Sequence, residues 1–317
     1  MMKQWLGIVL ILCFASFGLA RDNSQIHALR PFSGVQPPSN PCNGNPCDIN
    51  YNGGPVIEKA PTIYIVYYGK WTKQDKTIID TFFTNLGGTM MEKINTTYSD
   101  SNNNFVQNAL KHSTTNDYQD NYSLGKNLSA GDSDIHTIVR KAIKGGHLPT
   151  DTNGIYFVLT AKDVSFPGMC GSLCGYHSPA TDIVSGDVIW YSMVGNPAQC
   201  TPSQGQCEAS KVIGDGDKSP NNDAAADGTV NIMWHEFSES SSDPEVNMRT
   251  AWAGNFCGES GDCCAWLFGN TKIDSNGAHY NEQFKGHKYL TQVMLELTSK
   301  SRKGNVPAEC VNTYQKP

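Results

Sequence analysis

The sequence predicts a single secreted α/β domain that contains disulfides. Two apolar runs rich in β-branched and aromatic residues, 62–68 and 154–160, are typical of strands buried on both faces of a parallel sheet, and helical patterns lie between them. One of the 11 cysteines, Cys13, lies in the first 20 residues, which leaves ten in the rest of the chain. An even number with close spacings predicts disulfides in an oxidising compartment.

The first 20 residues have the three parts of a secretory signal peptide. Lys3 supplies the basic start, residues 6–14 form the apolar centre, and residues 18–20 (GLA) offer a small-x-small cleavage site. No later apolar run has the length of a membrane span. We therefore expect signal peptide 1–20 to be removed, no transmembrane segment, and release of the chain to the extracellular space or the cell wall.

Residues 21–55 form an irregular leader of the mature chain, and we expect the folded domain to cover residues 56–310. Proline and asparagine pairs interrupt regular structure in the leader, and Cys42 and Cys47 are close enough in sequence to close a small loop. The strand 62–68 then ends at Gly69. Thr72 is the expected cap of a helix that continues to Leu86.

The middle of the chain continues the α/β pattern after a polar stretch, 88–130, of expected loops and weak strands. A second helix, 135–144, follows Asp132 or Ser133 as cap and ends at two glycines. The strand 154–160 comes next, and residues 188–194 are a third candidate strand.

The C-terminal half is predicted to contain two more helices. One carries the segment 233–244 (MWHEFSESSSDP), with Asp227 or Thr229 as its cap. Residues 254–283 are expected to be loops with disulfides. Apolar residues spaced as on one helix face then predict an amphipathic helix over 289–297.

The segment 233–244 carries the most informative chemistry. On a helix, His235, Glu239 and Asp243 are four residues apart and share one face, and Glu236 lies beside that face. Two ligands one turn apart with a carboxylate beside the first form the pattern of a zinc hydrolase helix. The fifth position of that pattern is usually histidine, and zinc also accepts the carboxylate of Glu239. A zincin-like arrangement around His235 is therefore the expectation.

A second acidic motif supplies the remaining ligand. Nineteen residues, 240–258, separate Glu239 from Glu259, a spacing found between the ligand segments of thermolysin-like zincins. Glu259 is the first choice for the third zinc ligand, with Asp262 and Asp243 as alternatives. In this hypothesis His235, Glu239 and Glu259 hold zinc, and Glu236 is the catalytic base that takes a proton from water and returns it to the leaving group.

Simpler interpretations remain for each motif. The helix segment is also compatible with a solvated face, and Glu259 and Asp262 with turn residues beside disulfides. Cys170 and Cys174 are expected to form structural disulfides, and His177 to be a loop residue. A cluster rich in carboxylates also suits calcium, although a histidine ligand argues against calcium.

Composition excludes one class of partner and indicates a modification. The net charge is −6 and there is no basic block, so nucleic acid is not expected as a partner. Three glycosylation sequons, at Asn95, Asn121 and Asn127, lie in the polar stretch that we expect at the surface. Together with the signal peptide, they indicate a eukaryotic secretory route.

Several ordered segments resemble the EXORDIUM family, also called phosphate-induced protein 1. The resemblance covers roughly residues 50–300. The matching segments are YIVYYGKW (64–71), YSLGK (122–126), VLTAKD (158–163), MCGSLCGYH (169–177), PNND with DG (220–223 and 227–228) and GHKYL (286–290).

This resemblance implies a secreted extracellular or cell-wall protein, and plant members are associated with growth and hormone responses. Plant members carry small and apolar residues in place of His235 and Glu236, whereas this chain resembles microbial relatives with a His-Glu-x-x-Glu-x-x-x-Asp-Pro pattern followed by Glu-x-x-Asp-x-Cys. The leading hypothesis is a zinc-dependent, peptidase-like hydrolase. The alternative is a non-catalytic extracellular or wall-associated protein in growth or signalling, whose partner is an unidentified extracellular polypeptide or wall component.

Overall fold

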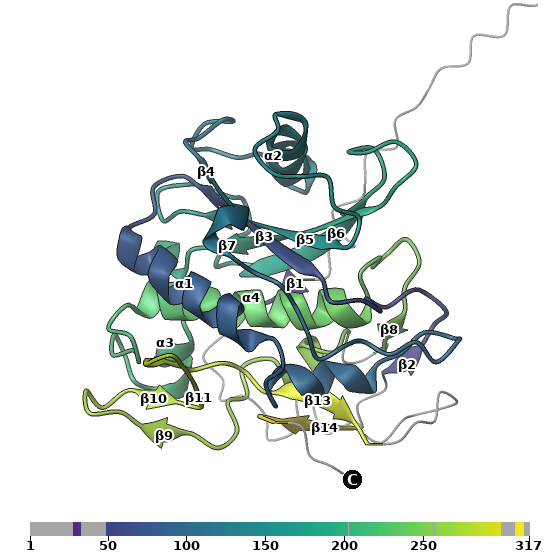
Figure 1. Cartoon of the computed structure of the whole chain (residues 1–317). Helices are drawn as coiled ribbons and strands as arrows, with labels where there is room; N and C mark the ends of the chain where they lie inside the picture. The colour runs from purple at the N-terminus through teal and green to yellow at the C-terminus, as the bar shows by residue number, and fades with distance from the viewer. Residues whose placement is uncertain (1–27, 33–48, 202, 256–257, 299–307, 314–317) are drawn as a thin grey trace, which may run out of the picture.

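A six-stranded mixed sheet forms the centre of the molecule, with helices on both faces (Figure 1). The computed structural model describes residues 28–32, 49–201, 203–255, 258–298 and 308–313. The strand order is β1-β6-β7-β5-β3-β4. Strands β7, β5, β3 and β4 are parallel to one another. At one edge of the sheet, β6 is antiparallel to β7, and β1 is antiparallel to β6.

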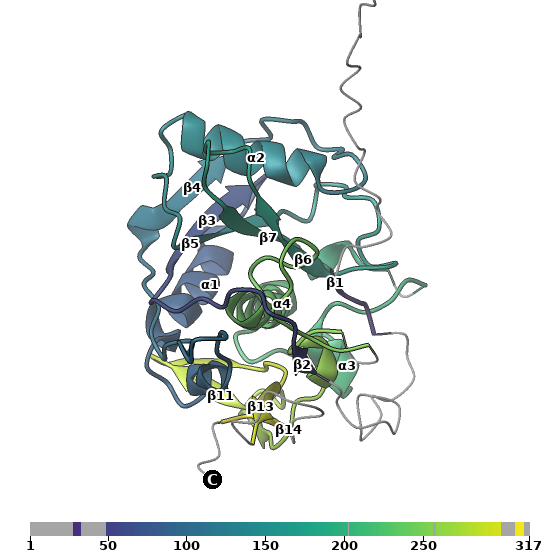
Figure 2. The ribbon, with the colours of Figure 1, turned by 90° about the vertical axis from the view of Figure 1, so that its right-hand side faces the viewer.

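Helix α2 covers one face of this sheet, and α1 and α4 pack together on the other (Figures 1 and 2). The α-helices are α1 (Lys73–Leu86), α2 (Ser133–Lys144), α3 (Ala209–Ile213) and α4 (Ala224–Ser242). Short 3-10 helices are η2 (Glu92–Thr97), η3 (Thr114–Asn116), η4 (Pro197–Gln199) and η5 (Asp262–Cys264).

Small two-stranded pairs surround the central sheet. The sheet strands are β1 (Ala28–Leu29), β3 (Thr62–Tyr68), β4 (Asp117–Asp120), β5 (Gly154–Thr160), β6 (Gly175–Ala180) and β7 (Ile189–Gly195). The paired strands are β2 (Asn50–Tyr51) with β8 (Trp252–Ala253), β9 (Lys272–Ile273) with β10 (His279–Tyr280), β11 (Glu282–Phe284) with β12 (His287–Tyr289), and β13 (Met294–Leu297) with β14 (Ala308–Val311).

The α/β prediction is confirmed for the three candidate strands and two helices of the first two thirds of the chain, although the sequence did not predict β6. The two buried runs are β3 and β5, adjacent and parallel over their full lengths, and the third candidate strand is β7. The Thr72 hydroxyl accepts a hydrogen bond from the Asp75 backbone N–H, while the Asp75 carboxylate accepts one from the Thr72 N–H. This reciprocal capping box fixes the start of α1.

Helix α4 begins earlier than the sequence predicted. Asp223 caps it, and its carboxylate accepts a hydrogen bond from the Ala226 N–H, so Asp227 and Thr229 lie inside the helix. Asp227 instead accepts hydrogen bonds from the backbone and side chain of Asn221. The prediction missed this start because a run of alanines carries no amphipathic pattern, although alanine favours helix.

The predicted helix over 289–297 is wrong, because residue 289 ends β12, residues 294–297 form β13 and residues 290–293 connect the two strands. Its apolar residues are buried as expected, but β12 pairs with β11 and β13 pairs with β14. Between the strands, the Gln292 backbone N–H donates to Asn231 Oδ1 of α4, and the Gln292 carbonyl accepts from Trp234. These tertiary hydrogen bonds outweigh a local helical pattern.

The polar stretch is only partly at the surface. Asn121 and Asn127 are exposed, as expected, whereas Asn95 is buried, with its amide 3.5 Å from Ser238 Oγ of α4. Glycosylation at the three sequons remains a prediction. Within the expected leader, β1 joins the central sheet through β6. The signal peptide and the Cys42–Cys47 loop lie outside the described residues.

Three disulfides are present among the described residues: Cys170–Cys200, Cys174–Cys207 and Cys264–Cys310. Cys170 and Cys174 are therefore structural, as predicted, but each pairs with a distant cysteine. The first two disulfides join the segments that flank β6 and β7, and the third joins η5 to β14. In the part of the chain that is described, no helix has both the length and the hydropathy needed to cross a bilayer.

Candidate metal centre

Helix α4 is buried almost along its whole length although it carries histidine and acidic residues. It lies between the central sheet and the C-terminal strand pairs (Figure 2) and contacts β6, β7, α1, α3 and β12. His235, Glu236 and Glu239 are each fully inaccessible to solvent. Burying an ionised side chain costs several kcal/mol unless a partner compensates, so these residues require partners inside the protein.

The structure brings together His235, Glu239 and Asp262, which was an alternative to Glu259 as the third ligand. His235 Nε2 lies 3.1 Å from Glu239 Oε1 and 3.8 Å from Asp262 Oδ1. The Asp262 backbone N–H donates a hydrogen bond to Glu239 Oε1 at 3.0 Å, which attaches η5 to the helix. Asp262 is the exposed edge of the group, with 24% of its side chain accessible.

His177 also belongs to the cluster, contrary to its prediction as a loop residue. It lies on β6, is 3% exposed, and its Nδ1 is 3.5 Å from Glu236 Oε2 and 3.7 Å from Glu239 Oε2. Its Nε2 is 3.4 Å from Glu259 Oε1. Glu259 is thus part of the cluster, next to His177. The sequence offered no periodic signal for His177, because the residues of β6 (GYHSPA) do not alternate between apolar and polar.

Asp243 lies at the C-terminal end of α4 and completes the cluster. Its backbone carbonyl accepts a hydrogen bond from His177 Nε2 at 3.1 Å, and its carboxylate accepts one from the Ala251 N–H. Pro244 follows and cannot continue the helix. All the predicted site residues, Glu236, His235, Glu239, Glu259, Asp243 and Asp262, therefore lie in one buried cluster with His177.

Hydrogen bonds fix the orientation of both imidazoles. Gln292 donates through its side-chain amide to the Gly261 carbonyl, so its Oε1 faces His235 Nδ1 at 3.2 Å and accepts a hydrogen bond from it. His235 Nε2 then has its lone pair toward the carboxylates. By the same argument, donation from His177 Nε2 to the Asp243 carbonyl turns the Nδ1 lone pair toward Glu236 and Glu239. A neutral imidazole fixed in this way is typical of a metal ligand.

Several buried polar atoms of the cluster have no hydrogen-bond partner among the described residues. They are His177 Nδ1, His235 Nε2, both oxygens of Glu236, Glu239 Oε2 and Asp243 Oδ2. Native proteins rarely leave such atoms unsatisfied. Lone pairs that face carboxylate oxygens require a cation or a proton between them.

The pKa values show how strongly the protein disfavours this many free charges. Burial raises the pKa of Glu236 and raises that of Asp243 to about 7 and that of Asp262 to about 8. Burial lowers the pKa of His235, but Glu239 and the other acids outweigh it and raise the value to about 10. The pKa of Glu239 falls although burial opposes this, because His235 stabilises its charge.

The donor set fits a transition-metal ion such as zinc. Two donors on a tetrahedral zinc, each about 2.0 Å from the metal, lie about 3.3 Å apart. The distances given above between imidazole nitrogens and carboxylate oxygens, 3.1 to 3.8 Å, cover that value. Two groups have ligand atoms close enough to share an ion: His177 with Glu239 and Glu259, and His235 with Glu236 and Glu239.

Two glycines allow this close packing. A Cβ on Gly175 of β6 would lie 2.7 Å from Ile232 Cγ2 and 3.0 Å from Glu236 Oε1, and a Cβ on Gly261 would lie 2.8 Å from His235 Nδ1. Any larger residue at either position would push the neighbouring element away from the cluster.

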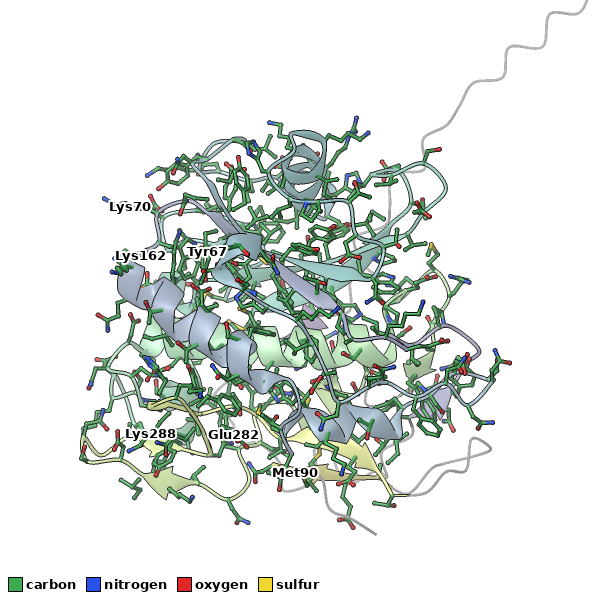
Figure 3. The ribbon with its side chains drawn as sticks, viewed as in Figure 1. Tyr67, Lys70, Met90, Lys162, Glu282 and Lys288 are labelled. Carbon is green, nitrogen blue, oxygen red and sulfur yellow. A yellow bond between two sulfur atoms is a disulfide. The ribbon has the colours of Figure 1, made fainter. Side chains whose placement is uncertain are left out.

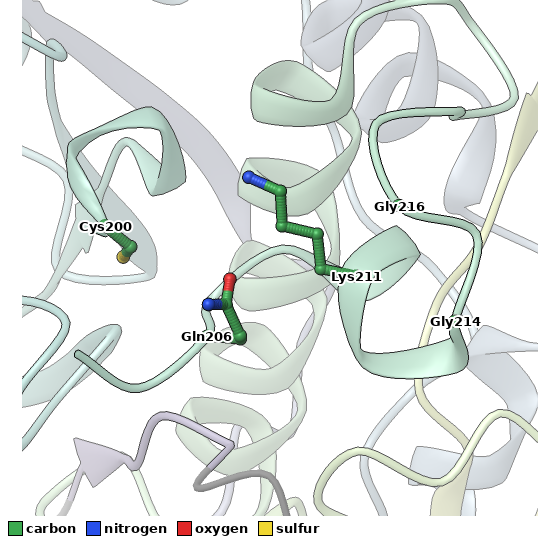
Figure 4. A pocket seen from close by; sticks show the side chains of 5 residues that line it. All are labelled: Cys200, Gln206, Lys211, Gly214 and Gly216. Carbon is green, nitrogen blue, oxygen red and sulfur yellow. The ribbon is translucent and has the colours of Figure 1, made fainter. Parts of the chain in front are cut away.

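A pocket lies apart from the cluster residues. It is lined by Cys200, Gln206, Lys211, Gly214 and Gly216, beside α3 (Figure 4). Lys211, which lines it, forms an ion pair with Glu208 at 2.8 Å. No residue of the metal-centre cluster lines this pocket.

The fold and site define a disulfide-containing α/β domain with a buried cluster of histidine and carboxylate side chains. The family described as the phosphate-induced protein 1 conserved region matches residues 49–304. The chain therefore belongs to the phosphate-induced protein 1, or EXORDIUM, family, as the ordered motifs predicted.

Curated relatives agree with this assignment. The chain is 26% identical to protein EXORDIUM-like 3 of Arabidopsis thaliana, over 77% of this chain and 79% of that protein. It is 26% identical to EXORDIUM-like 5 of the same plant, over 77% and 74% of the two chains. It is 25% identical to protein PHOSPHATE-INDUCED 1 of Nicotiana tabacum, over 78% and 85%. No solved structure matches the chain significantly.

Proposed function

We propose that this protein is a secreted zinc-dependent hydrolase of the peptidase type. The observation that carries the proposal is the pair of fixed imidazoles, His177 and His235, whose free nitrogens face the carboxylates of Glu236 and Glu239. Histidine and glutamate side chains are ligands of catalytic zinc sites, and Glu239 is shared by a group with His235 and a group with His177. Relative to the sequence hypothesis, His177 joins His235 and Glu239, with Glu259 beside them.

Glu236 is the group best placed for proton transfer. Neither of its oxygens has a hydrogen-bond partner among the described residues, and Oε2 lies 3.5 Å from His177 Nδ1. Zinc, when bound, lowers the pKa of water and polarises a substrate carbonyl. The Glu236 carboxylate, with its pKa raised by burial, takes the proton from the attacking water and delivers it to the leaving nitrogen. Asp262, with its partly exposed side chain, lies where substrate would approach.

A second function is favoured by the burial of the cluster. His235, Glu236, Glu239 and Glu259 are fully inaccessible, and a closed site is typical of a structural metal ion. In this alternative, the ion holds α4, β6 and the segment 259–262 together in a non-catalytic extracellular or wall-associated protein. The donor set suits zinc better than calcium, because calcium prefers oxygen ligands alone.

Secretion is part of both proposals. The disulfides support it, since such bonds persist in oxidising compartments, and the N-terminal sequence has the pattern of a signal peptide. The partner in either case is an unidentified extracellular polypeptide or wall component. The names of the plant relatives, EXORDIUM-like and PHOSPHATE-INDUCED 1, state no substrate, so the substrate is to be identified by experiment.

Replacing Glu236 by glutamine tests the hydrolase proposal. The Glu236→Gln variant keeps the shape of the side chain but cannot accept the proton, so we expect wild-type zinc content and loss of hydrolysis by at least about a hundredfold. Zinc is measured by elemental analysis, and hydrolysis on a mixed peptide library by mass spectrometry. Glu282→Gln, in a partly exposed glutamate of β11, is the matched control.

The two candidate functions separate cleanly in this experiment. Stoichiometric zinc with no cleavage by the wild type favours the structural role. Full cleavage by Glu236→Gln would show that Glu236 is not the catalytic base. Absence of zinc from the wild type would contradict both proposals.

A further inference from the structure

A second group of histidine and aspartate side chains lies at the opposite edge of the sheet. Asp80 is on α1, His112 precedes η3, and Asp117 begins β4, the edge strand farthest from β1 and β6 in the strand order. None of these residues belongs to the metal centre described above. Their ligand atoms are close enough to hold one ion.

His112 is the buried member of this group and is aimed at both carboxylates. Its side chain is 0% exposed, and its Nδ1 donates to the Ile63 carbonyl at 3.2 Å. This hydrogen bond leaves the Nε2 lone pair directed at Asp80 Oδ1, 3.7 Å away, and Asp117 Oδ1, 3.9 Å away. Neither His112 Nε2 nor Asp117 Oδ1 has a hydrogen-bond partner among the described residues.

We propose that Asp80, His112 and Asp117 bind a second divalent transition-metal ion, with zinc the best fit. The two distances are too long for hydrogen bonds and slightly wider than the spacing of about 3.3 Å between donors on tetrahedral zinc. One imidazole with two carboxylates suits zinc or a similar ion, and three protein ligands leave a position for water.

A neighbouring hydroxyl supports the ligand geometry. Tyr67 of β3 donates to Asp80 Oδ1 at 2.6 Å, and such outer hydrogen bonds orient the carboxylates that ligate metals. Figure 3 shows Tyr67 beside α1, at the end of the sheet where Lys70 also lies. The ammonium of Lys76 lies 4.4 Å from the centre of the Tyr67 ring and donates a hydrogen bond to Gln119.

The competing interpretation is a protonated His112 that pairs with both aspartates without a metal. Burial lowers the pKa of His112, but Asp80 and Asp117 outweigh it and raise the value. Burial, and then Asp80, raises the pKa of Asp117 to about 7. In this interpretation, protons rather than a metal ion lie between His112 Nε2 and the two carboxylates. The two interpretations therefore differ only in whether the protein holds a metal ion at this site.

The test is zinc stoichiometry on the full-length protein. Wild type, His112→Ala, Asp117→Asn and a control, His147→Ala, are stripped with a chelator, incubated with zinc sulfate, desalted and measured by elemental analysis. His235→Ala, which alters the α4 centre, is treated and measured in the same way. His147 is exposed at the same edge, where its ring stacks on Tyr118 at 4.2 Å. We expect the wild type and His147→Ala to hold one zinc ion per chain more than His112→Ala and Asp117→Asn.

Two outcomes overturn the proposal. One is equal zinc content in the wild type, His112→Ala, Asp117→Asn and His147→Ala. The other is a wild-type content of at most one ion per chain that His235→Ala abolishes, since that ion belongs to the α4 centre. Asp117→Asn preserves size and shape, so it decides the matter if circular dichroism shows that His112→Ala is misfolded. If His112→Ala lacks a zinc ion that His235→Ala still holds, the result supports this site even if the α4 centre binds no zinc.

Discussion

At the scale of single residues, His177 and His235 are each oriented by a hydrogen bond to a carbonyl or amide oxygen. The Asp243 carbonyl and the Gln292 amide oxygen each accept a hydrogen bond from one ring nitrogen and direct the other nitrogen inward. The Gln292 amide is itself oriented by the Gly261 carbonyl. The chemistry of the cluster thus depends on side chains from four separate segments.

Removing the His177 imidazole tests its place in the metal centre. We expect His177→Ala to lower zinc affinity by at least about tenfold, since even outer partners of a ligand contribute 10–100-fold. Competition with a chromogenic chelator measures the affinity. His136→Ala is the control, because His136 pairs with the exposed Asp182 at 2.7 Å. Unchanged affinity in His177→Ala would exclude this histidine from the ligand set.

At the scale of elements, the cluster of histidine and carboxylate side chains forms where α4 approaches β6 very closely at Gly175. An added Cβ there would meet Ile232 of the helix and, 2.9 Å away, the Met193 carbonyl of β7. The side chains of Glu236 and Glu239 can reach His177 only because this contact is short. The disulfides Cys170–Cys200 and Cys174–Cys207 tie the segments around the same strand.

Gly175→Ala should therefore destabilise the protein and weaken metal binding together. Overpacking of this kind costs about 1–3 kcal/mol. Urea unfolding followed by tryptophan fluorescence gives the loss in the free energy of unfolding. Gly171→Ala is the matched control, because its Cβ would meet only the Gly168 carbonyl, at 3.7 Å. Equal stability of the two variants would show that α4 can shift freely on the sheet.

The elements differ in how far the sequence could predict them. The strands β3 and β5 and the capped helix α1 were predictable because local pattern and tertiary environment agree. The segment 289–297 was not, because its partners Asn231, Trp234 and β14 are distant in sequence. At the site, the spacing of residues on one helix predicted that His235, Glu236 and Glu239 lie together. His177 and Gln292 lie in the cluster because of how the strands are arranged in the fold, and the spacing of residues in the sequence does not show this arrangement.

At the scale of the whole molecule, the buried acids couple stability to pH and to metal. Burial raises the pKa of Asp243 to about 7 and that of Asp262 to about 8, well above about 3.9 for an unfolded aspartate. Without metal, the folded chain then binds more protons than the unfolded chain between about pH 4 and pH 8. Its free energy of unfolding falls as pH rises through that window. His235, with its pKa raised to about 10, extends the same trend above pH 6.5.

We therefore expect the metal-free protein to melt at a lower temperature at pH 8 than at pH 5. Bound zinc replaces the protons, so adding zinc should raise the melting temperature more at pH 8. Free zinc at a hundred times its Kd stabilises by about 2.7 kcal/mol. Differential scanning calorimetry of chelator-treated protein, with and without zinc, measures both effects. If zinc raised the melting temperature by the same amount at pH 5 and pH 8, the buried acids would not couple metal binding to pH.

The buried position of Asn95 has a practical consequence for producing the protein. Glycans are added to a chain as it enters the secretory pathway, before η2 has packed against α4, and a sugar on this amide would leave no room for Ser238. Occupancy of that sequon would divert molecules from the native state, whereas Asn121 and Asn127 can carry sugars without hindrance. A host that forms disulfides but lacks N-glycosylation should thus give the more homogeneous preparation.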